Sequence, residues 1–401
     1  MNKKNLGVGT LEITPNAIKY VNEALKNERL SYGFFIKKFE QKLSSAHGCK
    51  FGVMVNSGTS ALSIAVACLK ETEEWQDGDE IIVPAVTFIA SSNVIIEHNL
   101  RPIFVDVDPL TYNIDHQKIE EKITKRTRAI MVVHLFGQPA EMDPIIKISK
   151  KYKLKLIEDS AETMIAKYKG MPVGSFGDIS CFSTYVAHLV VTGVGGLAAT
   201  KNPTYAEILR SLANHGRDGI YIDIDDDKDK SDEILKEIIS RRFHFIRRGY
   251  SFRVTELEGA LGLAQLEVII DNIKKRQKNA QYLTKSLKKY DNKIQLPYIS
   301  DYSEHVFMMY PIVLKKEIID NRNGIQKVEL VNYLEQNGIE TRDMLPLINQ
   351  PFYIEMFGFK KGDYPVADWI NDNGFYIGCH QKMGKEELNY ILKFFDEFFQ
   401  E

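Results

Sequence analysis

The chain has 401 residues, of which 44% are hydrophobic and 26% charged, a composition that can bury a sizeable core and is not typical of disorder. Its 52 basic and 54 acidic side chains give a formal net charge of -2, so charge offers no argument for a nucleic-acid or membrane-surface partner. The 4 cysteines are scattered without the paired spacing of zinc, iron–sulfur or disulfide sites, and we expect no metal. No apolar run suggests a signal core or a membrane span, and we expect a cytoplasmic protein.

The first half of the chain alternates short apolar runs with amphipathic stretches. This alternation is typical of an α/β fold with a mostly parallel sheet between helices. We predict helices at Ser60–Leu69, Ile119–Ile123 and Met142–Lys151. The predicted strands are Phe51–Val55, Glu80–Val83, Pro102–Val107, Ala129–Leu135, Lys155–Glu158, Ile179–Phe182 and Gly196–Thr200. Ligand sites in such folds lie at the carboxyl ends of the strands.

The pattern changes after Lys201. We predict a helix over 205–214, a solvated acidic loop over 223–230 and a long helical segment from Thr255 to about Tyr290. A smaller α+β domain follows from about His305, with helices near Val328–Glu335 and Lys385–Phe399. We therefore expect a large α/β domain over residues 1–250, and a helix-rich linker with a small C-terminal α+β domain over 251–401.

Several polar residues lie directly after predicted strands. Small residues around Gly58, Thr59 and Ser60 open a helix whose free amides and dipole suit a phosphate, although an ordinary N-cap has the same pattern. Phe88 follows the next strand, where an aromatic side chain is usually part of the core. Asp159 ends a buried strand and is costly there unless it is paired, whereas alternation places Glu158 on the opposite face.

The segment Ser183–Gly196 has a serine at its start, a glycine pair at its end and a histidine at position 188. Together with the motifs above, in this order, it resembles the cofactor loop of the DegT/StrS-type fold-type-I pyridoxal phosphate (PLP) enzymes, which amino-modify or deoxygenate nucleotide-linked sugars. The resemblance runs from about Leu30 to Phe399. It implies a fold-type-I architecture, with PLP or pyridoxamine phosphate as cofactor and a homodimer with shared active sites.

The resemblance also implies roles for single residues. Gly58, Thr59, Ser60 and Ser183 would bind the cofactor phosphate, Phe88 would stack on its ring, and Asp159 would pair with the ring nitrogen. Glu162 would lie close to the same ring. Aminotransferases of the family often have a glutamine at this position, and a carboxylate there resembles the dehydratase branch.

Further residues inherit weaker roles from the same resemblance. His215 lies in a turn near the cofactor, with a catalytic role or a purely structural one both open. Ser251 stands where relatives have an asparagine that reaches the partner's site. Tyr32, Arg342 and His380 belong to loops that frame the sugar-nucleotide site in relatives, although a structural role is open for each.

His188 occupies the position of the lysine that holds PLP covalently in these enzymes. A histidine can move a proton but cannot form that covalent link. The exchange resembles the pyridoxamine-phosphate-dependent 3-dehydratases of the colitose-pathway type, which act on nucleotide-linked 4-keto-6-deoxyhexoses and recharge the cofactor with glutamate. We therefore expect C3 deoxygenation of such a keto-sugar. A sugar aminotransferase of the same family, with glutamate as amino donor, is the alternative, and an inactive binding protein is the third possibility.

Overall fold

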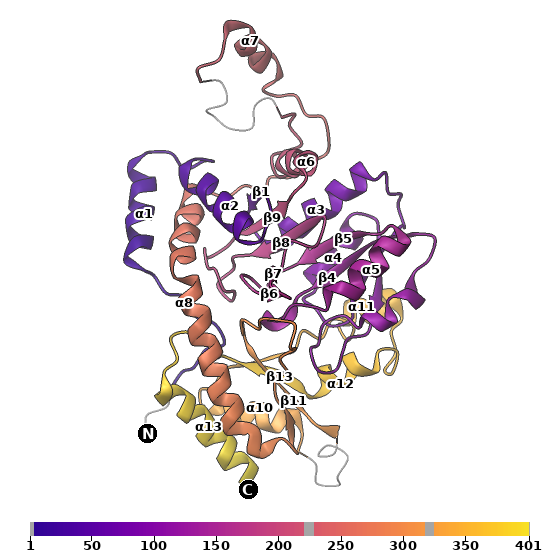
Figure 1. The fold of residues 1–401 in the computed structure, drawn as a ribbon, viewed down its shortest axis with the longest axis vertical. Coiled ribbons are helices and arrows are strands. Elements are labelled where there is room, and N and C mark those ends of the chain that lie inside the picture. The colour runs from indigo at the N-terminus through magenta and orange to yellow at the C-terminus, as the bar shows by residue number, and fades with distance from the viewer. Residues whose placement is uncertain (1–3, 220–227, 317–324, 401) are drawn as a thin grey trace.

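A large sheet between helices forms the upper part of the molecule (Figure 1). The structure is a computed structural model that describes residues 4–219, 228–316 and 325–400. The strands of the 7-stranded sheet run in the order β1-β9-β8-β5-β4-β2-β3, and β9 alone is antiparallel to its neighbours. They are β1 (Phe51–Val55), β2 (Glu80–Pro84), β3 (Arg101–Val105), β4 (Thr127–Val133), β5 (Lys155–Asp159), β8 (Ile179–Ser183) and β9 (Gly196–Thr200).

The predicted strands and the α/β fold class are confirmed. The sheet forms where apolar runs are buried on both faces, as in β2 and β8, whose residues are all buried. The helices around it are α1 (Pro15–Lys26), α2 (Phe34–Ala46), α3 (Gly58–Thr72), α4 (Ala90–Glu97), α5 (Met142–Tyr152) and α6 (Pro203–Ala213). The helix predicted over Ile119–Ile123 is wrong. Only a single 3-10 turn, Glu120–Lys122, forms there, because the segment is too short to sustain an α-helix.

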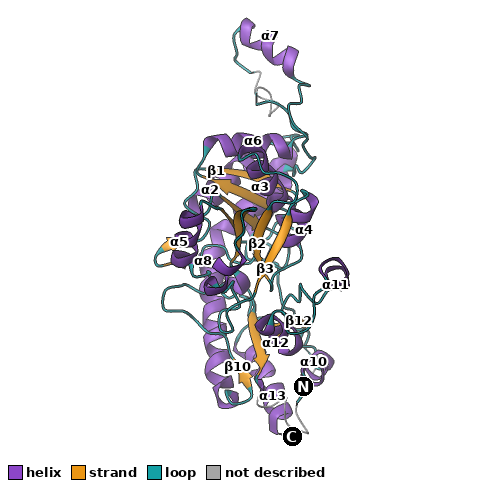
Figure 2. Cartoon of the chain, turned by 90° about the vertical axis from the view of Figure 1, so that its right-hand side faces the viewer, coloured by secondary structure: helices purple, strands orange, loops and turns teal. Residues whose placement is uncertain are grey.

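A second, smaller sheet lies below the first (Figures 1 and 2). It has 4 strands in the order β10-β11-β13-β12. These are β10 (Ile294–Gln295), β11 (Tyr310–Leu314), β12 (Thr341–Asp343) and β13 (Gly374–Ile377). Its helices are α10 (Lys327–Gln336), α11 (Pro351–Phe357), α12 (Pro365–Asn373) and α13 (Lys385–Gln400).

The long helix α8 (Glu256–Leu287) links the two parts. It begins at a capping box, in which Thr255 and Glu258 satisfy each other's backbone amides, and it packs against α1, α2 and α13. The N-terminal segment crosses to the small sheet, where Leu6 pairs with Ile339. The division at residue 250 stays a prediction.

Two short elements and an arm complete the fold. The hairpin of β6 (Lys167–Tyr168) and β7 (Met171–Pro172) packs beside the large sheet. The arm carries α7 (Asp232–Arg241) and extends beyond α6 in both views (Figures 1 and 2). Most of the acidic run over 223–230 lies outside the described residues. Within the described ranges, no helix combines the length and apolar character of a membrane span, and the predicted compartment stays a prediction.

Candidate active site

A cavity of about 400 Å³ opens at the carboxyl edge of the large sheet. Residues that directly follow β1, β2, β5 and β8 meet there, as expected for parallel strands. The residues predicted for the site that line it are Gly58, Thr59, Phe88, Asp159, Glu162, Ser183 and His188. None of the residues that line this cavity is a lysine.

The start of α3 forms one wall of the cavity. Ser57 caps the helix by accepting a hydrogen bond from the Ser60 amide at 3.0 Å. The hydroxyl of Ser60 is engaged in the same cap, because it donates to Oδ1 of Asn56 at 2.6 Å. Gly58 packs closely on Ser183, since a Cβ at position 58 would lie 2.7 Å from the Ser183 Cβ. Gly58, Thr59 and Ser183 therefore surround a helix N-terminus that is open to an anion.

Two buried carboxyl groups lie in the same cavity. Asp159 accepts hydrogen bonds from Ser91 Oγ at 2.7 Å and from the Ala161 amide at 3.2 Å, and burial raises its pKa. Glu162 accepts one from the Phe136 amide at 2.9 Å, and burial together with the charge of Asp159 raises its pKa to about 7. No lysine or arginine forms an ion pair with either carboxyl group among the described residues. The cavity therefore has two acceptors for a cationic group.

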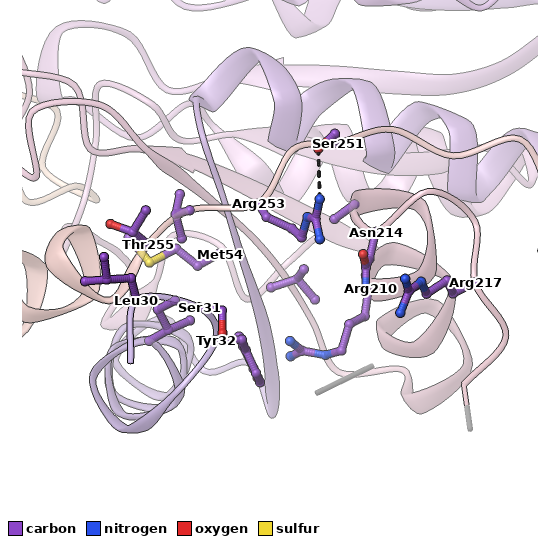
Figure 3. A pocket seen from close by; sticks show the side chains of 14 residues that line it. Leu30, Ser31, Tyr32, Met54, Arg210, Asn214, Arg217, Ser251, Arg253 and Thr255 are labelled. Atoms are coloured by element: carbon purple, nitrogen blue, oxygen red, sulfur yellow. Dashed lines mark hydrogen bonds between the residues drawn. The ribbon is translucent and has the colours of Figure 1, made fainter. Parts of the chain in front are cut away.

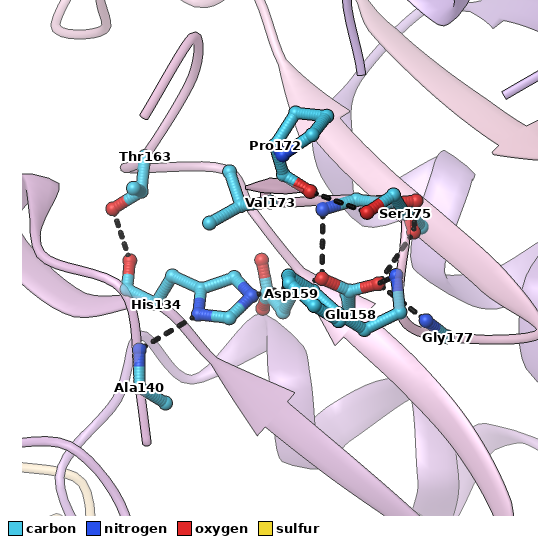
Figure 4. A network of polar contacts seen from close by, with 12 residues as sticks. His134, Ala140, Glu158, Asp159, Thr163, Pro172, Val173, Ser175 and Gly177 are labelled. Carbon is cyan, nitrogen blue, oxygen red and sulfur yellow. Dashed lines mark hydrogen bonds and ion pairs between the residues drawn. The ribbon is translucent and has the colours of Figure 1, made fainter. Parts of the chain in front are cut away.

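The other face of β5 carries a closed polar network (Figure 4). Glu158 accepts hydrogen bonds from the amides of Gly174 at 2.7 Å and Phe176 at 2.8 Å, and also from that of Gly177. His134 adds a contact from Nε2 at 3.1 Å. These donors hold the pKa of Glu158 below its usual value despite its burial, so Glu158 is structural, as alternation predicts.

His188 lies in a loop whose two ends are joined by hydrogen bonds between Thr184, Thr192 and Gly195. The Thr184 amide donates to the Gly195 carbonyl at 2.9 Å, and the hydroxyls of Thr184 and Thr192 lie 2.6 Å apart. Burial lowers the pKa of His188 to about 4, so its ring is neutral at neutral pH. Among the described residues its Nδ1 is buried without a hydrogen-bond partner, and a contact of the ring with the backbone of Ser183 offsets part of the effect of burial on the pKa. The ring can therefore accept a proton from a group in the cavity.

The small domain supplies the opposite wall, which the sequence motifs do not predict. Met308, Met309, Leu345 and Tyr376 line the cavity there. The negative charge of Glu162 and burial both raise the pKa of Tyr376. Phe88 is 58% exposed at the mouth, so it is not the core residue that such a position usually holds. The apolar walls exclude water from the two carboxyl groups.

Other predicted residues lie in a second pocket of about 600 Å³ (Figure 3). Tyr32 faces Arg210 there, with the guanidinium 4.9 Å from the ring centre. Ser251 accepts a hydrogen bond from Arg253 at 3.2 Å, and the same guanidinium donates to Nε2 of His215 at 3.0 Å. The structure thus brings Tyr32 and Ser251 into one pocket, with His215 bound to its arginine, but not into the cavity of His188.

Arg342 and His380 line neither pocket. Arg342 donates to the carbonyl of Thr341 at 2.7 Å and pairs with Glu340. His380 is buried, three residues after the end of β13, and burial lowers its pKa to about 4. The predicted role of Arg342 and His380 in substrate binding stays a prediction.

The cavity fits a phosphorylated pyridine cofactor. It offers a helix N-terminus for the phosphate, and the Asp159 carboxyl, which has no cationic partner, for a protonated ring nitrogen. These features on this fold define a fold-type-I pyridoxal phosphate enzyme. The chain matches the model of the DegT/DnrJ/EryC1/StrS aminotransferase family over residues 12–396 and belongs to that family. The family depends on pyridoxal phosphate, so the predicted cofactor is confirmed.

The chain is similar to relatives that carry two different names. It is 31% identical over 387 residues to the GDP-4-keto-6-deoxy-D-mannose 3-dehydratase of Escherichia coli O55:H7, covering 93% of this chain and 95% of that one. It is 33% identical over 391 residues to the GDP-perosamine synthase of Escherichia coli O157:H7, covering 97% of each. The structure superposes on that of an E. coli GDP-4-keto-6-deoxy-D-mannose-3-dehydratase with bound hydrated PLP. The TM-score is 0.86 at 27% identity, covering 97% of this chain and 99% of that one.

Proposed function

We propose that this enzyme removes the C3 hydroxyl of a nucleotide-linked 4-keto-6-deoxyhexose. The observation that carries the proposal is His188, which lies in a cavity that no lysine of the described part of the chain lines. Without a lysine the cofactor is held by non-covalent contacts alone, and pyridoxamine phosphate is its working form. The relative named as a 3-dehydratase supports the substrate class.

Each residue of the cavity has a task in this reaction. When bound, the cofactor supplies an amino group and an electron sink. Gly58, Thr59 and Ser183 hold its phosphate, and the carboxylate of Asp159 fixes the protonated ring nitrogen. His188 is neutral because of burial, so its ring would accept the proton. The apolar walls keep water out while the hydroxyl leaves. Hydrolysis would release the 3-deoxy sugar together with ammonia, and glutamate would supply a new amino group for the next turnover.

The second candidate is transamination of the same class of keto-sugar. The relatives named as GDP-perosamine synthases support it, because their similarity to this chain is as high as that of the dehydratase. In that reaction His188 would be the sole proton carrier. A binding protein without activity is the third candidate.

Mass spectrometry of the product separates the three. The protein is incubated with PLP, glutamate and nucleotide-linked 4-keto-6-deoxyhexoses that differ in nucleotide. We expect the sugar to lose one oxygen. Replacement of the carbonyl oxygen by an amine would establish the aminotransferase, and an unchanged sugar with no glutamate-dependent conversion of PLP would establish the binding protein.

His188→Lys tests the role of the histidine directly. We expect this variant to bind PLP covalently and to lose deoxygenation, whereas His215→Asn should still release the deoxy sugar. Undiminished deoxygenation by His188→Lys would overturn the proposal that His188 is the base.

We also propose a homodimer with shared sites. The mouth of the cavity exposes Phe88 (58%), Tyr185 (52%) and Val194 (53%), more apolar surface than an isolated site would leave in water. Ser251 and Arg253 line the separate second pocket and not the cavity of His188, so we expect them to act in the cavity of a partner. Light scattering after gel filtration should give twice the mass of one chain, and a monomer that retains full activity would exclude shared sites.

A further inference from the structure

A chain of two buried hydroxyls leads to Asp159. Thr87 Oγ1 lies 2.8 Å from Ser91 Oγ, and Ser91 Oγ lies 2.7 Å from Oδ2 of Asp159. Thr87 follows β2 and Ser91 lies one turn later in α4, so Ser91 reaches Asp159 from across β4 and Thr87 contacts Ser91. We propose that Ser91, aligned by Thr87, is a positioning residue that keeps Asp159 ionised and directed at the cofactor ring.

The direction of the hydrogen bonds follows from the chemistry of the three groups. An ionised carboxylate only accepts hydrogen bonds, so Ser91 must donate its proton to Asp159. The Ser91 oxygen then has a lone pair free, and it accepts a hydrogen bond from the Thr87 hydroxyl. Both hydroxyls are therefore fixed in the orientation that stabilises the charged form of Asp159, and a hydrogen bond to a charged group is the stronger kind.

The surroundings of Asp159 oppose its charge. Burial raises its pKa, Glu162 adds a second carboxyl group in the same cavity, and the buried thiol of Cys181 lies on the adjacent strand β8. His134, from the end of β4, acts in the opposite direction, and neutral His188 faces the same cavity. Besides Ser91, only the amide of Ala161 donates to the Asp159 carboxyl group among the described residues. Loss of the Ser91 hydroxyl removes the shorter of these two hydrogen bonds.

This inference deepens the proposed function, on which it rests for the role of the cofactor ring, but its first test needs neither cofactor nor turnover. Thermal unfolding of the cofactor-free protein is followed from below the ordinary pKa of Asp159, 3.8, up to pH 8 for Ser91→Ala and Ser92→Ala. Ser92 is the matched control, because it is the next residue of α4, is also 0% exposed, and has no hydrogen bond to Asp159. A raised pKa in the folded state makes stability fall as pH rises through it.

We expect Ser91→Ala to raise the pKa of Asp159 by about one unit, a tenfold shift of the ionisation equilibrium. Its midpoint temperature, relative to Ser92→Ala, should therefore fall as the pH rises. The difference in midpoint temperature between Ser91→Ala and Ser92→Ala should become independent of pH when each substitution is made in a protein that also carries Asp159→Asn. A loss that is equal at every pH, or that persists unchanged in that background, would overturn the proposal.

The second test measures binding of pyridoxamine phosphate by equilibrium titration. We expect Ser91→Ala to bind about tenfold more weakly than the wild type, and Thr87→Ala to show a smaller loss. Ser91→Thr, which keeps the hydroxyl, should restore binding, and Ser92→Ala should bind normally. The absorption band of the bound cofactor should change with pH in the same order. Normal binding and an unchanged pH profile in Ser91→Ala would contradict the proposal that Ser91 positions Asp159. This test holds whether the enzyme dehydrates or transaminates its sugar.

Discussion

Glu158 and Asp159 are neighbours on β5 and are both buried, yet the two faces of the sheet treat them differently. On the face away from the cavity, Glu158 accepts hydrogen bonds from three amides and contacts His134, and these donors lower its pKa despite burial. On the face toward the cavity, Asp159 accepts from one hydroxyl and one amide, and burial raises its pKa.

Equal burial therefore does not mean an equal role. The carboxylate of Glu158 has a full set of hydrogen-bond donors from the protein, so it holds the chain in place and has no acceptor capacity left for a ligand. The carboxylate with fewer donors has acceptor capacity left on the side of the cavity, and shifted pKa values of this kind gather at functional sites.

Removal of Glu158 should have the largest effect on stability. Glu158→Ala would leave the buried amide of Gly174, the half-buried amides of Phe176 and Gly177, and the His134 ring without their acceptor. We expect a loss of about 3–5 kcal/mol in the free energy of unfolding, measured by urea denaturation. A loss below about 1 kcal/mol would contradict the structural role of this network.

Asp159→Asn should show the reverse pattern. The cofactor-free protein should keep its stability to within about 1 kcal/mol, because an amide still accepts from Ser91. Product formation should fall by about a hundredfold or more, since the charge that faces the cofactor ring is lost. A variant that is as unstable as Glu158→Ala would show that both carboxylates are structural.

Glu162 allows a test of pH dependence. Its pKa of about 7 in the folded protein lies above its ordinary value of 4.5. Its contribution to stability is therefore complete below pH 4.5 and is lost as pH rises through 7. Glu162→Gln should remove this loss and be more stable than the wild type at pH 8 by about 1–3 kcal/mol. Parallel pH profiles of the two midpoint temperatures would exclude the raised pKa.

A single neutral hydrogen bond gives the smallest expected effect. Thr163 donates to the carbonyl of His134 at 2.6 Å (Figure 4). Thr163→Val keeps the shape of the side chain and should cost about 0.5–1.5 kcal/mol, with no change in cofactor affinity. A loss of cofactor affinity would show that the segment after β5 is not held independently of the site.

The sequence was sufficient to predict the sheet and the residues that follow its strands. Phe51–Val55 and Ile179–Phe182 are apolar runs with clear ends, and alternation alone separated Glu158 from Asp159. Residues that reach the cavity from elsewhere had no such signal. Tyr376 lies on an ordinary buried strand of the small domain, and only the packing of the two domains brings it to the cavity.

Ser91 shows a second limit of prediction. A serine in the first turn of a helix predicts a role in the N-terminal cap of that helix. Its bond to Asp159 joins residues that are 68 positions apart, and no local pattern encodes it. The spacing of Thr87 and Ser91, four residues apart after a strand that ends at the site, was the one available clue.

The loop around position 188 has a consequence for how such proteins diversify. Thr184, Thr192 and the Gly195 carbonyl close its ends, and the contact of the His188 ring with the backbone of Ser183 is not one of these closing bonds. One codon can therefore exchange the reactive group while the backbone around it stays the same. The loop would then keep its closing hydrogen bonds when the side chain at position 188 is replaced, so fold and chemistry could change separately at this point.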